Sequence, residues 1–344
     1  MDSTASFISI GLPRTGTMAA TGAIFSSALS RLILVDPLAY LDILRSVIKQ
    51  LVKLIRVYQW TKSGFIFLPF VFSDYLFQIK NNPFSDASFG LYIKLLMSFF
   101  GFSFLASSVY ILNDWKDRAE DRLDPRKMHR PFAAGTVPGW LGLTLAAVLF
   151  STAMFFAYSL SRGALLVFSI YFVMNIFYSL IGKRIVLLDV FIIAIGFVLR
   201  VIGGAFSLSI EASPWLLSCT FFVALFLGFF KRFYEVKVGP AEILMGGVYN
   251  AESLRHFINI TAGLSIMNYS IYSLQGKHAD AQLVWTIPLV VLGIFRYYML
   301  MQSPEDIEDG NPSDLLLADK FLILIILSWI ALCAVLILYV PSIR

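Results

Sequence analysis

The stretch from Asn113 to Asp124 is the most polar segment of a chain that is otherwise largely apolar. On a helix that turns about 100° per residue, Asp114, Asp117 and Asp121 lie within roughly 60° of one another. Asp124 widens that arc only to about 80°. Carboxylates crowded on one helix face repel each other unless a cation neutralises them, and hard oxygen donors suit Mg²⁺, which usually shares its shell with substrate phosphates. The spacing therefore predicts a magnesium site for a phosphate-bearing substrate.

Basic residues follow these carboxylates at once. Pro125 is expected to end the helix, and Arg126, Lys127 and Arg130 come directly after it as partners for phosphate. A solvated, salt-bridged loop between two membrane helices is the alternative explanation of such a run of mixed charges.

The composition is that of a protein embedded in a bilayer. Hydrophobic residues make up 58% of the 344 residues and charged residues 14%, whereas soluble domains carry about 25% charged residues. We expect an all-α, polytopic membrane protein whose partner is the lipid bilayer and not a nucleic acid. Apolar runs of about 17 to 25 residues predict nine transmembrane helices, near 64–80, 91–112, 138–158, 163–181, 186–206, 214–230, 257–275, 282–301 and 320–340.

The cysteines and histidines do not point to a metal site. Cys219 and Cys333 lie inside predicted spans, where they are expected to be buried thiols. His129, His256 and His278 are scattered without ligand spacing, which argues against zinc.

The distribution of positive charge predicts the orientation. The segments 41–62, 113–137, 182–185 and 231–256 hold 5, 6, 2 and 4 Lys or Arg residues, whereas the loops expected on the opposite side hold only Arg162 and Lys277. Loops rich in Lys and Arg stay in the cytoplasm. The polar motifs and the N-terminus are therefore expected on the cytoplasmic side, and the C-terminus outside.

Three parts of the chain are expected. Residues 1–40 form a poorly defined extension, rich in small residues and without a convincing signal peptide. Residues 41–62 are predicted to form a basic amphipathic helix on the inner leaflet, or else a partner-binding helix. Residues 63–344 are predicted to be the transmembrane catalytic domain. The interfacial helix rests on four basic residues spaced by four, four and three positions: Arg45, Lys49, Lys53 and Arg56.

A second polar group lies around the start of the fifth predicted span. Tyr178 and Lys183 precede it, and Asp189 and Arg200 lie within it. Charged residues at membrane depth usually face a polar cavity or a partner. For Arg200, snorkelling toward the outer surface is the alternative.

A third polar group closes the sixth predicted span. It consists of Lys231, Arg232 and Glu235. Taken alone it is either a cytoplasmic anchor, with Lys231 and Glu235 paired one helical turn apart, or part of a site.

The order of these residues resembles the signature of the UbiA-type superfamily of intramembrane prenyltransferases: Asn113-Asp114-x-x-Asp117-x-x-x-Asp121, followed by Tyr178-x-x-x-x-Lys183. The resemblance implies an all-helical bundle with a central cavity that opens to the cytoplasmic side and to lipid. Members usually carry a second motif, D-x-x-x-D, which holds a second Mg²⁺. Here Ile193 stands four residues after Asp189, and this departure disfavours ordinary prenyl transfer.

From residue 50 onward the chain resembles the decaprenyl-phosphate phosphoribosyltransferase branch of that superfamily. The resemblance implies a bacterial cell-membrane enzyme that transfers 5-phosphoribose from phosphoribosyl pyrophosphate to a polyprenyl phosphate, for lipid-linked pentose in cell-envelope glycans. The residues that carry it are Arg56-x-x-Gln59-Trp60-x-Lys62, Asn113 through Asp124-Pro125-x-Lys127-x-x-Arg130-Pro131-x-Ala133-x-Gly135, Tyr178-Ser179, Lys183, Asp189, Arg200-x-x-Gly203-Gly204, Trp215, Lys231-Arg232-x-x-Glu235, Gly293-Ile294-Phe295-Arg296-Tyr297 and Leu315-Leu316-Leu317-x-Asp319-Lys320.

The resemblance also implies roles for individual residues. Asp114, Asp117 and Asp121 are the expected catalytic residues, and Mg²⁺ is expected on Asn113, Asp117 and Asp121, with Asp114 as a further donor. Because three phosphate groups meet in this reaction, many fixed cations are needed. The expected substrate-binding residues are Lys62, Lys127, Arg130, Tyr178, Lys183, Asp189, Arg200, Lys231 and Arg232.

The expected chemistry is displacement at the ribose anomeric carbon. The lipid phosphate is already an anion near neutral pH, so it needs positioning more than deprotonation. Two alternatives stay open: a prenyl diphosphate transferase acting on an aromatic acceptor, and a lipid carrier without catalytic activity.

Overall fold

The computed structural model describes residues 45, 48–238, 249–275, 282–302 and 319–339, and all regular structure within these ranges is helical. The chain divides into residues 1–50 and residues 51–344. The predicted extension 1–40 lies outside the described residues.

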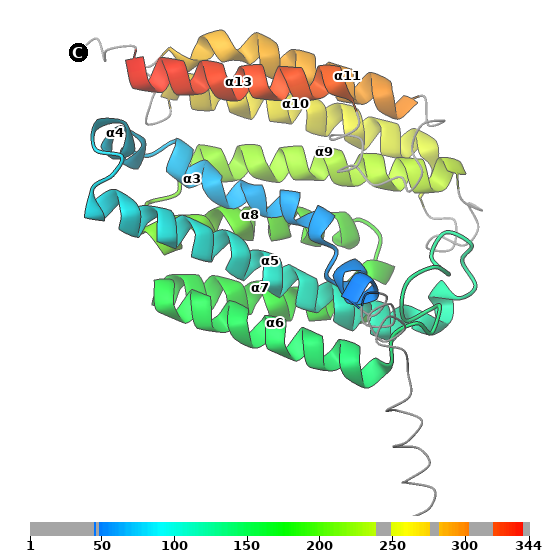
Figure 1. The fold of residues 1–344 in the computed structure, drawn as a ribbon. Coiled ribbons are helices and arrows are strands. Elements are labelled where there is room, and N and C mark those ends of the chain that lie inside the picture. Colours follow the sequence, from blue (N-terminus) through cyan, green and yellow to red (C-terminus); the bar gives the residue numbers. More distant parts are fainter. Residues whose placement is uncertain (1–44, 46–47, 239–248, 276–281, 303–318, 340–344) are drawn as a thin grey trace, which may run out of the picture. The chain divides into compact units, whose positions relative to one another are not determined.

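Eight long helices make up most of residues 51–344 (Figure 1). They are α5 (Asp86–Asp121), α6 (Gly139–Leu160), α7 (Arg162–Leu180), α8 (Leu188–Leu208), α9 (Pro214–Val238), α10 (Ala251–Gln275), α11 (Ile287–Gln302) and α13 (Lys320–Tyr339). Five short helices connect or precede them: η1 (Val57–Phe67), α3 (Leu68–Val71), α4 (Tyr75–Asn81), η2 (Gly182–Arg184) and η5 (Leu283–Thr286).

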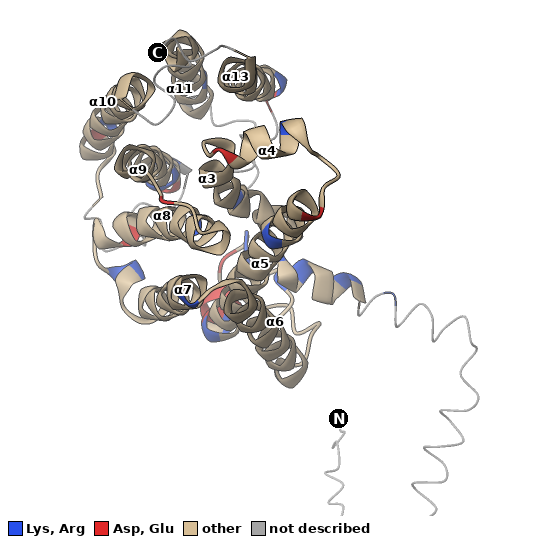
Figure 2. Ribbon diagram, turned by 90° about the vertical axis from the view of Figure 1, so that its left-hand side faces the viewer, with Lys and Arg blue, Asp and Glu red and all other residues tan. Residues whose placement is uncertain are grey.

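The all-α membrane class predicted from composition is confirmed. Within the described residues, seven helices are long and apolar enough to cross a membrane: α5, α6, α7, α8, α9, the η5–α11 pair and α13. Helix α10 is 25 residues long but more polar, and its buried polar residues include Thr261, Ser265, Asn268 and Ser273. Figure 2, a view along the helices, shows that most of their length carries neither acidic nor basic residues.

The predicted first span, 64–80, is not one continuous helix. The 3₁₀ helix η1 runs into the short helix α3, and the chain turns at residues 72–74 before α4 begins. Pro69 lies in the first turn of α3, where its missing N–H costs nothing. The hydroxyl of Ser73 donates to the carbonyl of Phe70 at 2.8 Å and closes the turn.

Helix α5 carries the acidic motif at its end. Ser85 caps its start by accepting from the backbone N–H of Ser88. At about 1.5 Å per residue, its 36 residues span roughly 54 Å, well beyond a hydrocarbon core of about 30 Å. The last, charged turns therefore project past the apolar layer. The helix ends at Asp121, so the prediction that it continues to Pro125 is wrong.

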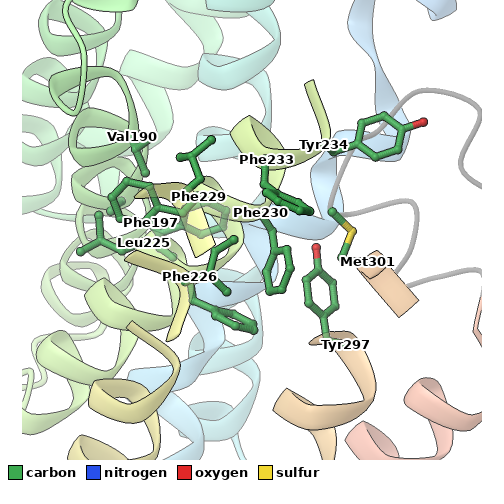
Figure 3. Close-up of a cluster of buried hydrophobic side chains, with 14 of the residues drawn as sticks. Val190, Phe197, Leu225, Phe226, Phe229, Phe230, Phe233, Tyr234, Tyr297 and Met301 are labelled. Carbon is green, nitrogen blue, oxygen red and sulfur yellow. The ribbon is translucent and has the colours of Figure 1, made fainter. Parts of the chain in front are cut away.

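Neighbouring helices in the sequence pack side by side. Helix α5 packs on α6, α8 packs between α7 and α9, and α9 packs on α10. The largest buried cluster joins α8, α9, α10 and α11. Figure 3 shows Phe226 and Phe230 of α9 next to Tyr297 of α11, and the ring centres lie 5.7 and 5.6 Å from that of Tyr297.

A glycine allows η1 to lie directly against α8. A Cβ on Gly204 would stand 2.2 Å from the carbonyl oxygen of Ile66, which is backbone and has little room to move. Gly204 thus permits a contact that any larger residue would prevent. This contact holds the segment that carries Lys62 beside α8.

Candidate active site

Three carboxylates on the last turns of α5 are each paired with a cation. The ammonium of Lys183 lies 2.7 Å from each carboxylate oxygen of Asp117. Nη1 of Arg130 lies 3.1 Å from Asp114 and 2.9 Å from Asp121. The fold therefore brings the three predicted catalytic carboxylates together with two of the predicted phosphate partners. We call Asn113, Asp114, Asp117 and Asp121 the carboxylate face.

Arg56 belongs to this group as well, so its predicted place on the basic stripe of an interfacial helix is wrong. Its Nη2 donates to both oxygens of Asp114, at 2.6 and 2.7 Å. Burial works against the charge of Arg56, but the Asp114 carboxylate outweighs it and raises the pKa of the guanidinium. The helical turns before it end at Ile55, because Arg56 adopts a left-handed backbone with φ 55°. The predicted helix 41–62 therefore stops seven residues early.

Two hydrogen bonds hold the turn at Arg56 against α5. The indole N–H of Trp60 donates to the hydroxyl of Ser107 at 3.0 Å, and that hydroxyl donates to the carbonyl of Ile55 at 2.7 Å. The three-residue step from Lys53 to Arg56 fits a helix face as well as a four-residue step does, so the spacing carries no signal of this turn.

The end of α7 docks on the carboxylate face. The hydroxyl of Ser179 donates to the side-chain oxygen of Asn113, and the ammonium of Lys116 donates to the backbone carbonyl of Ser179. These contacts fix the amide of Asn113 on the same face as Asp117 and Asp121, which follow it at four-residue intervals.

Lys127 and Asp124 pair with each other beyond the end of α5. The ammonium of Lys127 lies 3.1 Å from Asp124, whose other oxygen accepts from the backbone N–H of Arg126 at 3.0 Å. Partial burial acts to raise the pKa of Asp124, but the Arg126 N–H and the Lys127 ammonium outweigh it and lower that pKa. Because α5 ends at Asp121, Asp124 does not extend the carboxylate face as the helical spacing predicts.

Asp189 lies at the start of α8 and is fully buried. Nε of Arg232 lies 2.5 Å from one carboxylate oxygen, and the hydroxyl of Tyr249 donates to the other at 2.8 Å. Arg232 also donates from Nη1 to Glu235, and its Nη2 lies 3.5 Å from the hydroxyl of Tyr178. Burial raises the pKa of the Tyr249 phenol well above its usual range, so the hydroxyl stays protonated. No spacing or composition signal marks Tyr249 in the sequence.

A cavity of about 600 Å³ lies between η1, α3 and α8 on one side and α10, α11 and α13 on the other, with α9 in its wall. Most of its lining is apolar, including residues of α9, α11 and α13. Its charged lining residues are Lys62, Lys231 and Arg200, and Tyr178 lines it too. The residues of the carboxylate face do not line it.

Arg200 lies in the wall of this cavity with only 4% of its surface exposed. Its Nη1 donates to the carbonyl of Gly196 at 2.9 Å and its Nη2 to the hydroxyl of Tyr171 at 2.8 Å. The guanidinium carbon lies between 5.0 and 5.3 Å from the ring centres of Phe102, Tyr171 and Phe197. The Nε hydrogen is buried without a partner.

The donors of the carboxylate face fit a divalent cation in their chemistry. Three carboxylates and one amide oxygen offer hard ligands on consecutive turns of one helix. In the arrangement described here each carboxylate is neutralised by Arg56, Arg130 or Lys183. Accordingly, no three acidic, histidine or cysteine side chains converge on one point among the described residues.

Similar proteins were found by sequence and by structure. The chain is 31% identical over 247 residues to a decaprenyl-phosphate phosphoribosyltransferase of Mycobacterium tuberculosis, which covers 69% of this chain and 80% of the relative. It is 28% identical over 258 residues to the protein of that name from Corynebacterium glutamicum, covering 72% and 76%.

The fold is that of solved UbiA homologues. A UbiA homologue from Archaeoglobus fulgidus, bound to DMAPP and Mg²⁺, matches with a TM-score of 0.64 and 16% identity, over 84% of this chain and 99% of that one. The model of the UbiA prenyltransferase family matches residues 69–310. This chain, a transferase, therefore belongs to the UbiA prenyltransferase family.

Proposed function

We propose that this protein transfers 5-phosphoribose from phosphoribosyl pyrophosphate to a polyprenyl phosphate and releases pyrophosphate. The observation that carries the proposal is the separation of cationic side chains into two groups. Arg56, Arg130 and Lys183 lie on the carboxylate face, whereas Lys62 and Lys231 line the apolar cavity. A reaction between a pyrophosphate and a lipid phosphate needs cations in both places. The names of the curated relatives support the same pair of substrates.

In the proposed reaction an oxygen of the lipid phosphate forms a bond to C1 of the ribose. The bond from C1 to the pyrophosphate oxygen breaks, and the pyrophosphate leaves with the electron pair. Atoms and charge balance without the removal of a proton. The protein therefore has to orient two anions and to stabilise the leaving group, which fixed cations do well in a site that excludes water.

Asn113, Asp117 and Asp121, with Asp114, are the residues that would hold Mg²⁺. The ion would supply charge stabilisation to the pyrophosphate. Arg56, Arg130 and Lys183, which contact these carboxylates, are the side chains nearest to share the pyrophosphate charge, and Lys127 lies just beyond the helix end.

The cavity is the proposed site of the lipid. Its apolar lining suits an isoprenoid chain, and Lys62, Lys231 and Arg200 are the charges available to its phosphate. Part of a long chain would extend from the cavity into the bilayer.

We place the site on the cytoplasmic side of a bacterial cell membrane. The ends of α5, α7 and α9 that carry the charged residues lie together at the right of Figure 1. This side carries most of the positive charge of the loops, as a cytoplasmic side does. Among the described residues, counting the helical segment of η1 and α3 with the eight long helices gives nine crossings, the number that the apolar runs predict.

The proposal is tested by offering purified protein two sets of substrates with Mg²⁺. One set is phosphoribosyl pyrophosphate with decaprenyl phosphate, and the other is a prenyl diphosphate with 4-hydroxybenzoate. We expect pyrophosphate release and a phosphoribosylated lipid from the first set only. Prenylation of the aromatic acid without phosphoribosyl transfer would instead favour a prenyl diphosphate transferase.

A further inference from the structure

Both carboxylate oxygens of Asp189 are occupied by other groups of the protein. Its side chain has no exposed surface. One oxygen is held by Arg232 at 2.5 Å and the other by the Tyr249 hydroxyl at 2.8 Å. A divalent cation at this point would need free carboxylate oxygens, and the residue one turn further along α8 is Ile193, which offers none.

Tyr249 fixes both Asp189 and the backbone that presents it. Besides donating to Asp189, the phenolic oxygen accepts the backbone N–H of Leu187 at 2.6 Å. Leu187 has φ 68°, a conformation that side chains other than glycine rarely adopt. This backbone therefore needs outside support, and the buried Tyr249 provides it from 62 residues further along the chain.

The result is a guanidinium held from two sides. Asp189 accepts a hydrogen bond from Nε of Arg232, and Glu235 accepts one from Nη1. The remaining nitrogen, Nη2, is directed at the hydroxyl of Tyr178, which lines the cavity. The neighbouring Lys231 also lines the cavity and lies 4.0 Å from Glu235. Arg232 itself does not line the cavity, and it acts there through Tyr178: since Nη2 is directed at the phenolic oxygen, the Tyr178 hydrogen can point into the cavity beside Lys231.

We propose that Tyr249 and Asp189 are positioning residues that fix Arg232 against the Tyr178 hydroxyl, beside Lys231, and that this wall of the cavity binds the phosphate of the lipid without a metal ion. The inference rests on the proposed function for the identity of the lipid, and it deepens that function by assigning the two substrates to different kinds of charge. Pyrophosphate is stabilised at the carboxylate face with a divalent cation, whereas the lipid phosphate binds to charges that belong to the protein alone.

The test measures binding of farnesyl phosphate, a short polyprenyl phosphate, to the purified full-length protein in detergent. Titrations are run in EDTA and in Mg²⁺. For the wild-type protein we expect the two dissociation constants to agree within about twofold. Tyr249→Phe should weaken binding by roughly 3- to 10-fold in both conditions, because the two hydrogen bonds of its hydroxyl, to Asp189 and from the backbone N–H of Leu187, are lost. In turnover assays the same variant should raise KM for the lipid phosphate and leave KM for phosphoribosyl pyrophosphate unchanged.

Two further variants make the result specific. Tyr158→Phe removes a hydroxyl from an exposed tyrosine at the far end of α6 and should bind like the wild type. Arg232→Lys keeps the charge but cannot contact Asp189, Glu235 and Tyr178 at once, so it should weaken binding at least as much as Tyr249→Phe. Should Tyr249→Phe fail to fold, as judged by thermal unfolding, Arg232→Lys decides the question.

Three outcomes would overturn the inference. The first is that the wild-type protein binds farnesyl phosphate at least tenfold more weakly in EDTA than in Mg²⁺. The second is that Tyr249→Phe and Arg232→Lys both bind farnesyl phosphate with wild-type affinity. The third is that these variants bind ribose 5-phosphate more weakly while their binding of farnesyl phosphate is unchanged. None of these measurements requires turnover. Metal-independent lipid binding in a protein without phosphoribosyl transfer would contradict the proposed function and leave this inference standing.

Discussion

Arg200 does not extend toward the outer surface, so the snorkelling alternative is wrong. Its Nη1 bonds back to the carbonyl of Gly196, one turn nearer to the charged end of α8. Three aromatic rings surround the guanidinium and its Nε hydrogen has no partner. Leaving a buried donor unpaired costs roughly 1–3 kcal/mol, a cost that a bound phosphate in the cavity would remove.

Arg200→Lys tests whether this side chain contacts a substrate. A lysine keeps the charge but cannot reach two acceptors in a planar fork, so we expect turnover to fall by about 10-fold or more, and further in Arg200→Ala. Kinetics with each substrate varied in turn show which KM rises. Wild-type kinetics in the lysine variant would remove Arg200 from the site.

Loss of charge on the carboxylate face should be costly for the reaction. Asp117→Asn and Asp121→Asn are each expected to lower turnover by roughly 10²-fold or more, because each carboxylate supplies charge to the metal that stabilises the leaving pyrophosphate. Asp124→Asn makes the same chemical change beyond the end of α5 and should stay within about threefold of the wild type. Near wild-type rates of Asp117→Asn and Asp121→Asn at limiting Mg²⁺ would contradict the proposed metal site.

The relative positions of side chains were predictable from the sequence where local spacing decides them. The four-residue intervals from Asn113 to Asp121 place these side chains on one face of any helix. The contacts of Arg56 and Tyr249 depend on segments that meet only after folding, across 58 residues to Asp114 and 60 residues to Asp189. No periodicity records such long-range contacts.

At the scale of elements, long apolar runs predict helices well, and polar or proline-bearing runs do not. Helices α6, α7 and α8 begin and end within two residues of the predicted spans. The span predicted at 64–80 contains Pro69 and Asp74, and the structure divides it into η1, α3 and α4. Apolar composition shows that this segment is buried, but it does not show that the segment is one helix.

Gly204→Ala tests the close contact between α8 and η1. The added methyl group would meet the carbonyl of Ile66 at 2.2 Å, so η1 has to move away, at a cost of about 1–3 kcal/mol. We expect a lower thermal unfolding midpoint and weaker lipid phosphate binding, because η1 carries Lys62. Gly263→Ala on α10 has open space around its Cβ, and it should leave the midpoint unchanged or raise it. Equal midpoints for the two variants would show that the contact is not tight.

In the whole molecule, two kinds of chemical surroundings are separated along the bundle. The carboxylate face stands on the projecting end of α5, and the apolar cavity runs between the other helices. Under the proposed function, the water-soluble sugar phosphate approaches the carboxylate face from the aqueous side and the lipid occupies the cavity.

The central claim is that the lipid phosphate attacks the ribose while the isoprenoid carbon to oxygen bond stays intact. The most direct measurement uses decaprenyl phosphate labelled with ¹⁸O in its non-bridging oxygens, phosphoribosyl pyrophosphate and Mg²⁺, with mass spectrometry of the products. The account predicts that all of the label stays in the lipid product, including the oxygen between phosphorus and ribose C1, and that the released pyrophosphate is unlabelled. Release of labelled inorganic phosphate, with the isoprenoid chain joined to an acceptor, would contradict it.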